Sequence, residues 1–149
     1  MTLEAWREAG LLVSHEATPE EIADLLAVAE TDLRDAAIAG LSPERKLGCA
    51  YGAILSAARA ALHAAGHRVP KSTSHHHYTI QSLRYTVGLT PPIILRIEAL
   101  QKKRNAADYV RVGDVADALA EEARALAAGV VARVRQWIVA NHPELFGEG

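Results

Sequence analysis

The chain has 149 residues, a net charge of −2 and a single cysteine, Cys49; half of its residues are hydrophobic, while only 5% are aromatic. An alanine-rich, aromatic-poor composition favours closely packed helices over sheets, and the near-neutral charge gives no global basic signal for nucleic acid. The lone cysteine excludes an internal disulfide, no apolar run approaches the roughly 20 residues of a membrane span, and the N-terminus is unlike a signal or transit peptide. We therefore expect a cytoplasmic protein of one domain, residues 1–149, that does not associate with a membrane.

Helix start signals and apolar spacing predict the elements in chain order. Residues 1–17 form an N-terminal arm with a short helix over 2–13. Thr18, followed by a proline and then by Glu21 at the third helical position, is a capping box, and Ser42 before a proline starts a second helix in the same way. The predicted long helices span about residues 19–39, 43–65, 91–109 and 114–140, a shorter one spans 75–87, and residues 142–149 form a tail.

Helices of this length joined by short loops pack as an antiparallel bundle. We predict an all-α fold, an antiparallel four-helix up-and-down bundle over about residues 19–140. The short helix and the N-terminal arm are expected to lie across this bundle. Gly66 is the predicted end of the second long helix, and Asp114 is the predicted cap of the last one.

Arg104 is the unusual residue of the third long helix. It follows Leu100 by four positions, on the apolar stripe that should face the core, and Asp108 follows it by four on the same face. An arginine on such a stripe is costly unless it is paired or lies at a hydrated interface. One interpretation is an i,i+4 ion pair between Arg104 and Asp108 that braces the helix. The other is a polar pocket at a two-fold interface, formed with Asn105 and Tyr109, that could hold a phosphate or a nucleotide.

The histidines suggest a metal site, but their spacing argues against one. His63 and His67 are four apart, as in helical zinc pairs, yet Gly66 is predicted to end the helix between them. The three consecutive histidines at 75–77 would point in different directions on a helix, and no acidic or cysteine ligand is fixed near them in sequence. We expect no metal and no cofactor, and glycine-rich phosphate loops and nucleophile motifs are also absent from the sequence.

Three segments resemble the HEPN superfamily (higher eukaryote and prokaryote nucleotide-binding domains). They are the small-residue helix AYGAILSAARAALHAAGH with the histidine-containing loop after it, the short helix that begins with histidines, and LQKKRNAADYV before a final amphipathic helix. The similarity spans about residues 43–140 and is strongest toward compact bacterial single-domain members. It implies a HEPN-like bundle that forms a homodimer with a cleft.

The ribonucleases of this superfamily carry an arginine, usually followed by a polar residue, and then a histidine a few positions later. Arg104 and Asn105 match the first half, but no histidine follows in the window, where Tyr109 stands instead. Imidazole titrates near neutrality, whereas a phenol with a pKa near 10 is a poor proton shuttle. Toxin members also have a tyrosine two places beyond that histidine; Arg111 occupies this position, so modification of such a tyrosine is not supported.

The resemblance therefore implies a homodimeric binding or regulatory module for RNA, a nucleotide or a partner protein, without robust catalysis. The expected binding residues are Arg104, Asn105, Asp108, Tyr109, His76 and His77.

Two alternatives stay open. One is a metal-independent ribonuclease or toxin component of a toxin–antitoxin or defence system, with Arg104 as the catalytic candidate and an antitoxin or nucleotidyltransferase as partner. In it, His76 or His77 would supply the missing imidazole from another helix. The other is a structural helical protein without a ligand, in which Arg104 and Asp108 only brace their helix.

Overall fold

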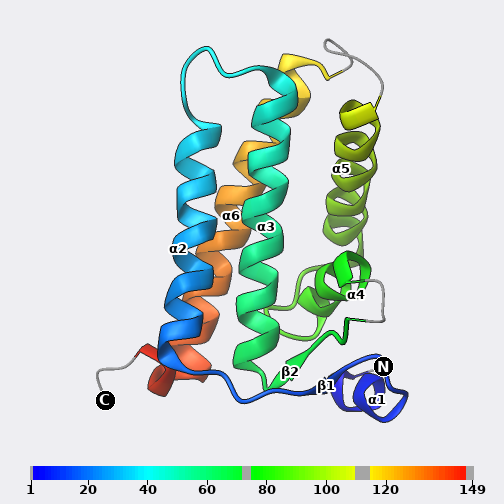
Figure 1. The fold of residues 1–149 in the computed structure, drawn as a ribbon, viewed down its shortest axis with the longest axis vertical. Helices are drawn as coiled ribbons and strands as arrows, with labels where there is room; N and C mark the ends of the chain where they lie inside the picture. The colour runs from blue at the N-terminus through cyan, green and yellow to red at the C-terminus, as the bar shows by residue number, and fades with distance from the viewer. Residues whose placement is uncertain (1, 72–74, 110–114, 147–149) are drawn as a thin grey trace.

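The computed structural model describes residues 2–71, 75–109 and 115–146, and only the backbone of residues 75 and 106–109 (Figure 1). These residues are mostly helical, which confirms the predicted all-α class. Successive long helices run in opposite directions along the molecule (Figure 1). The long helices are α2 (Pro19–Ala36), α3 (Pro43–Ala64), α5 (Pro91–Tyr109) and α6 (Asp117–Asn141). The short ones are α1 (Leu3–Glu8), α4 (His75–Gln81) and the 3₁₀ turns η1 (Ser82–Arg84) and η2 (Pro143–Phe146).

Both predicted N-caps are confirmed. The hydroxyl of Thr18 accepts a hydrogen bond from the Glu21 backbone N–H at 3.1 Å, and the hydroxyl of Ser42 accepts one from the Arg45 N–H at 3.2 Å. The end of α2 falls three residues before the predicted position, because the Ala37 N–H bonds to the Arg34 carbonyl and closes the helix with a tight final turn.

Other predicted boundaries differ as well. The helix predicted over residues 2–13 spans only Leu3–Glu8, and Gly10, with a left-handed φ of 81°, follows its end. The short helix predicted over 75–87 is α-helical only to Gln81 and tightens into the 3₁₀ turn η1. The predicted cap Asp114 lies outside the described residues, and α6 begins at Asp117 after Ala116, which makes no side-chain capping hydrogen bond.

Helix α3 is the central element of the fold. It packs along α2 and α6, and α5 and α4 contact another of its sides (Figure 1). A helix enclosed in this way must be apolar nearly all round, and small alanine side chains let its neighbours approach closely. Its buried residues are Leu47, Ala50, Tyr51, Ala53, Ile54, Ser56, Ala57, Ala58, Ala60, Ala61, Leu62 and Ala64.

The prediction of a purely helical fold missed a small antiparallel sheet. Strands β1 (Val13–Ser14) and β2 (His67–Arg68) pair so that the first residue of each lies opposite the last residue of the other. The His15 N–H continues this pairing and donates to the Gly66 carbonyl at 2.9 Å. Two-residue strands are too short to show the period-two pattern by which strands are predicted.

The sheet ties the N-terminal arm to the end of α3. Trp6 and Leu12 of the arm form a second, smaller core with Leu62 of α3. The Trp6 ring also makes edge-to-face contacts with Tyr78 and Tyr85, at centroid distances of 5.4 and 5.3 Å. The arm is therefore packed on the end of the molecule at which β1 and β2 lie (Figure 1).

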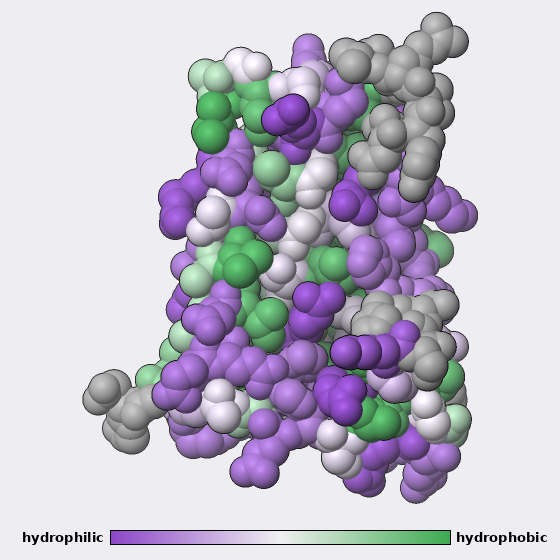
Figure 2. Space-filling view, viewed as in Figure 1, coloured by the Kyte–Doolittle hydropathy of each residue, from purple (hydrophilic) through white to green (hydrophobic). Residues whose placement is uncertain are grey.

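Polar side chains cover most of the face seen in Figure 2, and apolar side chains form only small patches there. Among the described residues, none of the helices combines the length and the apolar character needed to cross a membrane.

Candidate functional site

Arg104 lies on the face of α5 that packs against the rest of the fold. Ile97 and Leu100, on the same stripe, are 0% and 6% exposed, and Arg104 is partly buried. Its guanidinium carbon is 5.6 Å from the centroid of the Tyr51 ring on α3. A cation over an aromatic face gains about 0.5–2 kcal/mol, depending on how far it is desolvated. An aromatic contact therefore accommodates the arginine on the apolar stripe.

The other members of the predicted pocket do not add to this contact. Asn105 is exposed. Asp108 and Tyr109 belong to α5, but their side chains lie outside the described residues, so the predicted Arg104–Asp108 pair lies outside them as well.

His76 of α4 reaches the same tyrosine from another side. Its Nδ1 lies 3.5 Å from the Tyr51 hydroxyl oxygen and 3.5 Å from the amide nitrogen of Gln101 on α5. Both neighbours carry hydrogen-bond donors, so Nδ1 can accept a hydrogen bond from either of them. We call Tyr51, His76, Gln101 and Arg104 the Tyr51 cluster; it unites one cation, one phenol and one imidazole from three helices.

His77 is not part of this cluster. Its side chain is 53% exposed, and its Nδ1 lies 3.2 Å from a carboxylate oxygen of Glu98. The same oxygen accepts a hydrogen bond from the Gln81 side chain at 3.1 Å. Of the two histidines predicted to bind ligand, the structure thus brings only His76 toward Arg104.

The phenol of Tyr51 stays protonated. The side chain is buried, and this burial raises its pKa to about 12, although the charge of Arg104 acts in the opposite direction. A phenol in this state can donate a hydrogen bond but cannot take up a proton near neutral pH. Its role in the cluster is to support the guanidinium and the imidazole.

A groove of about 620 Å³ lies next to Arg104, and its lining is more acidic than basic. The groove is lined by three carboxyl groups and two guanidinium groups, those of Asp32, Asp35, Glu44, Arg45 and Arg104. Burial, reinforced by the charge of Asp35, raises the pKa of Asp32. The groove itself is therefore poorly suited to a phosphate, which would have to bind at the guanidinium.

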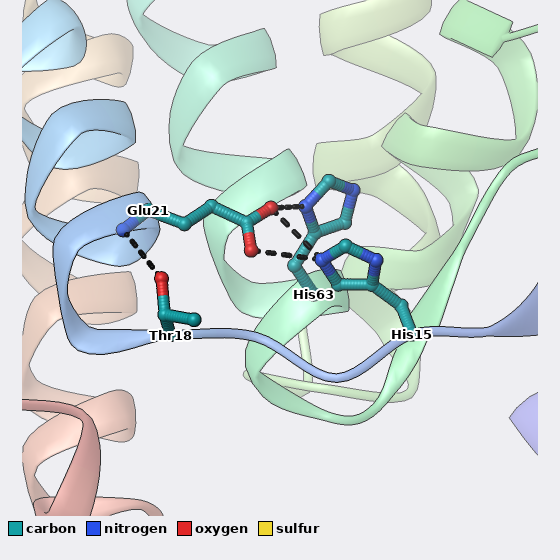
Figure 3. Close-up of polar contacts among 4 residues, drawn as sticks. All are labelled: His15, Thr18, Glu21 and His63. Carbon is teal, nitrogen blue, oxygen red and sulfur yellow. Dashed lines mark hydrogen bonds and ion pairs between the residues drawn. The ribbon is translucent and has the colours of Figure 1, made fainter.

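The structure also reveals a polar cluster that sequence reasoning missed, formed by His15, Glu21 and His63 (Figure 3). The carboxylate oxygens of Glu21 lie 2.8 and 2.9 Å from His15 Nε2, and one of them lies 2.6 Å from His63 Nδ1. The two rings are 4.4 Å apart between centroids. We call these three residues the His–Glu cluster.

No spacing in the sequence could have identified this cluster, because its members stand 6 and 42 positions apart. The sequence spacing pairs His63 with His67, but His67 lies on β2 with its Nε2 3.3 Å from a carboxylate oxygen of Glu4. Glu21 was interpreted as half of a capping box; the Thr18 half is confirmed, but the Glu21 carboxylate bonds to the two imidazoles.

The protonation states of the His–Glu cluster follow from burial and hydrogen bonding. Burial acts to raise the pKa of Glu21, but hydrogen bonds from His15 and His63 outweigh it and hold the pKa below its ordinary value. Burial lowers the pKa of His63, and the bond to Glu21 only partly offsets this. The cluster therefore combines an ionised carboxylate with an imidazole that favours its neutral form.

The described residues thus offer two sites with different chemistry. The Tyr51 cluster presents a half-buried cation with hydrogen-bond donors, and the His–Glu cluster presents nitrogen and oxygen ligands. Comparisons of the chain with protein-family models, with curated proteins and with solved structures returned no match.

Proposed function

We propose that the protein is a HEPN-like homodimeric binding module in which Arg104 receives a phosphate group of RNA or of a nucleotide. The observation that carries this proposal is the convergence of Arg104 and His76 on Tyr51. The alternating directions of α2, α3, α5 and α6 support the HEPN-like bundle that the sequence resemblance implies.

The chemistry of the Tyr51 cluster suits recognition of a phosphate. A guanidinium presents a planar set of donors that can bond two phosphate oxygens at once. The Tyr51 ring, whose centroid lies 5.6 Å from the guanidinium carbon, supports the cation from one side. The exposed amide of Asn105 is an additional donor.

The same geometry argues for binding without cleavage. The Tyr51 phenol is held in its protonated form, and the histidine of the ribonuclease motif is missing from the window after Arg104. The acidic side chains of the neighbouring groove would also repel a phosphate chain that extended into it. A single phosphate at the guanidinium fits these constraints better than a long RNA track.

Titration of labelled short RNA and of nucleotides at low salt tests the proposal. We expect saturable binding that Arg104→Ala weakens about 10- to 100-fold, since a hydrogen bond to a charged group contributes about 1.5–3 kcal/mol. Arg96→Ala is the matched control, because Arg96 lies on the same helix but pairs with Glu122 at 2.8 Å. Absence of binding, or an equal loss in both variants, would overturn the proposal.

The homodimer is tested separately by sedimentation at micromolar concentration. The chain has a mass of 16.0 kDa, so a dimer would sediment as a particle of about twice that mass. A monomer that still binds RNA through Arg104 would leave the binding proposal standing and remove the two-fold interface from it.

A ribonuclease or toxin component is the second candidate, because His76 supplies an imidazole on the same phenol that Arg104 contacts. An imidazole contributed by another helix would take the place of the missing motif histidine. Incubation with mixed RNA in the presence of a chelator distinguishes the candidates. Cleavage that is lost in both Arg104→Ala and His76→Ala would favour the ribonuclease, with an antitoxin or nucleotidyltransferase as the partner to seek. Absence of both cleavage and binding would favour a purely structural helical protein.

A further inference from the structure

The His–Glu cluster gathers three side chains that bind transition metals, and it gathers them from three parts of the chain. His15 comes from the segment after β1, Glu21 from the first turn of α2, and His63 from the last turn of α3. One ligand atom from each, nitrogen or carboxylate oxygen, lies within 4.8 Å of the others. Figure 3 shows both rings turned toward the same carboxylate.

The separations are shorter than those of a tetrahedral zinc site, but by little. With zinc–nitrogen and zinc–oxygen distances of about 2.0–2.2 Å, the ligand atoms of a tetrahedral site lie about 3.3–3.6 Å apart. The observed distances from the Glu21 oxygens to the two nitrogens are 2.6–2.9 Å. An ion would therefore need the side chains to move apart by only about half an ångström to one ångström.

The cluster is held in place by the backbone around it. The His15 N–H donates to the Gly66 carbonyl, which fixes the segment after β1 against the end of α3. Thr18 caps the helix that carries Glu21. The side chains are only 22%, 28% and 13% exposed for His15, Glu21 and His63, so ligand positions are restrained before an ion arrives.

We propose that His15 Nε2, His63 Nδ1 and the Glu21 carboxylate bind one zinc ion. Two imidazoles and one carboxylate form the ligand set of open zinc sites, in which a fourth position remains for water or another ligand. The ion takes the place of the hydrogen bonds between the two imidazoles and the Glu21 carboxylate, and it links the N-terminal arm to α2 and α3.

The surroundings indicate what the fourth ligand would be. His63 also lines a cavity of about 230 Å³ whose wall includes the basic side chains Arg59, Arg68 and Lys71. These charges oppose any cation, the proposed zinc included, and attract an anion that would offset this repulsion. A small anion such as phosphate, or water, is the fourth ligand that this setting favours.

The proposed ion is independent of the Tyr51 cluster. Tyr51 and His63 are both on α3 and twelve residues apart, which corresponds to about 18 Å along the helix. Loss of RNA or nucleotide binding at Arg104 would therefore leave the zinc proposal untouched.

Calorimetric titration of the full, metal-free chain with zinc chloride tests the proposal. We expect one ion per chain in the wild type. His15→Gln, Glu21→Gln and His63→Gln should each weaken binding by more than the roughly 10- to 100-fold that loss of an outer-shell partner causes. Replacing zinc with cobalt gives a second readout, because tetrahedral cobalt absorbs visible light strongly and the three variants should lose this absorption.

Two control variants address other possible ligands. His77→Ala removes a histidine that pairs with a single glutamate, and Cys49→Ser disrupts the group formed by Asp32, Asp35 and Cys49. Both should keep the ion. The proposal would be overturned if the wild type failed to bind zinc, if the cluster variants still bound it, or if Cys49→Ser lost the ion. Circular dichroism checks that each variant folds. If a histidine variant does not fold, zinc binding by Glu21→Gln tests the proposal, because its amide oxygen can still accept a hydrogen bond from one imidazole.

Discussion

Alkaline pH should destabilise the protein through Tyr51. Its side chain is 1% exposed, and its pKa is raised to about 12 from a model-peptide value of about 10. A raised pKa means that the folded state holds the phenolic proton more tightly than the unfolded state does. This contribution to stability is complete below about pH 10 and is lost as the pH rises toward 12. Two pKa units correspond to about 2–3 kcal/mol of unfolding free energy.

The assay is urea unfolding of the wild type and of Tyr51→Phe at a series of pH values from 8 to about 11.5. At pH 8 the two proteins should differ by about 1 kcal/mol or less, because the bond that the hydroxyl makes among the described residues is a long one, to His76. Above pH 10 the wild type should lose stability faster than Tyr51→Phe, while Tyr78→Phe, which leaves Tyr51 in place, should follow the wild type. Parallel curves for the wild type and Tyr51→Phe would refute the inference that this phenol is buried against Arg104.

The glycines provide two further predictions, both measurable by urea unfolding. A Cβ at Gly48 would meet nothing within 4 Å, so Gly48→Ala should raise the unfolding free energy by about 0.5–1 kcal/mol. Gly52→Ala should raise the unfolding free energy by less, because the added Cβ would lie 2.8 Å from a carboxylate oxygen of Asp32. Equal gains would contradict the close approach of α2 to Gly52. Gly66 has a φ of 92°, so Gly66→Ala should cost about 1–2 kcal/mol, and an unchanged stability would contradict this left-handed backbone.

Much of the fold was predictable because its determinants are local. The hydroxyls of Thr18 and Ser42 cap helices within three residues of themselves, and Gly66 supplies the left-handed residue that ends α3. The pairing of β1 with β2 was not predictable. It joins two-residue segments more than 50 positions apart, and neither segment alone has a pattern that distinguishes it from a loop.

The candidate sites, like the fold, were predictable only where their determinants are local in the sequence. Arg104 was identifiable because a charge on an apolar stripe is visible in the sequence, and its partial burial agrees with that position. Its contact with Tyr51 was not identifiable, because it depends on how α5 packs against α3. The His–Glu cluster gave no signal at all, since His15 lies in a connecting segment and Glu21 already had an interpretation as a helix cap.

The central position of α3 has a consequence for how the chain folds during synthesis. Helix α2 can pair with α3 at once across a short connection, but α6, which covers another side of α3, comes about 50 residues later. At a translation rate of about 5–20 residues per second, roughly 3–10 s pass before α6 begins to be made, so this alanine-rich side stays uncovered for at least that long. We therefore expect the nascent chain to be most exposed to aggregation in the interval between the emergence of α3 and that of α6 from the ribosome.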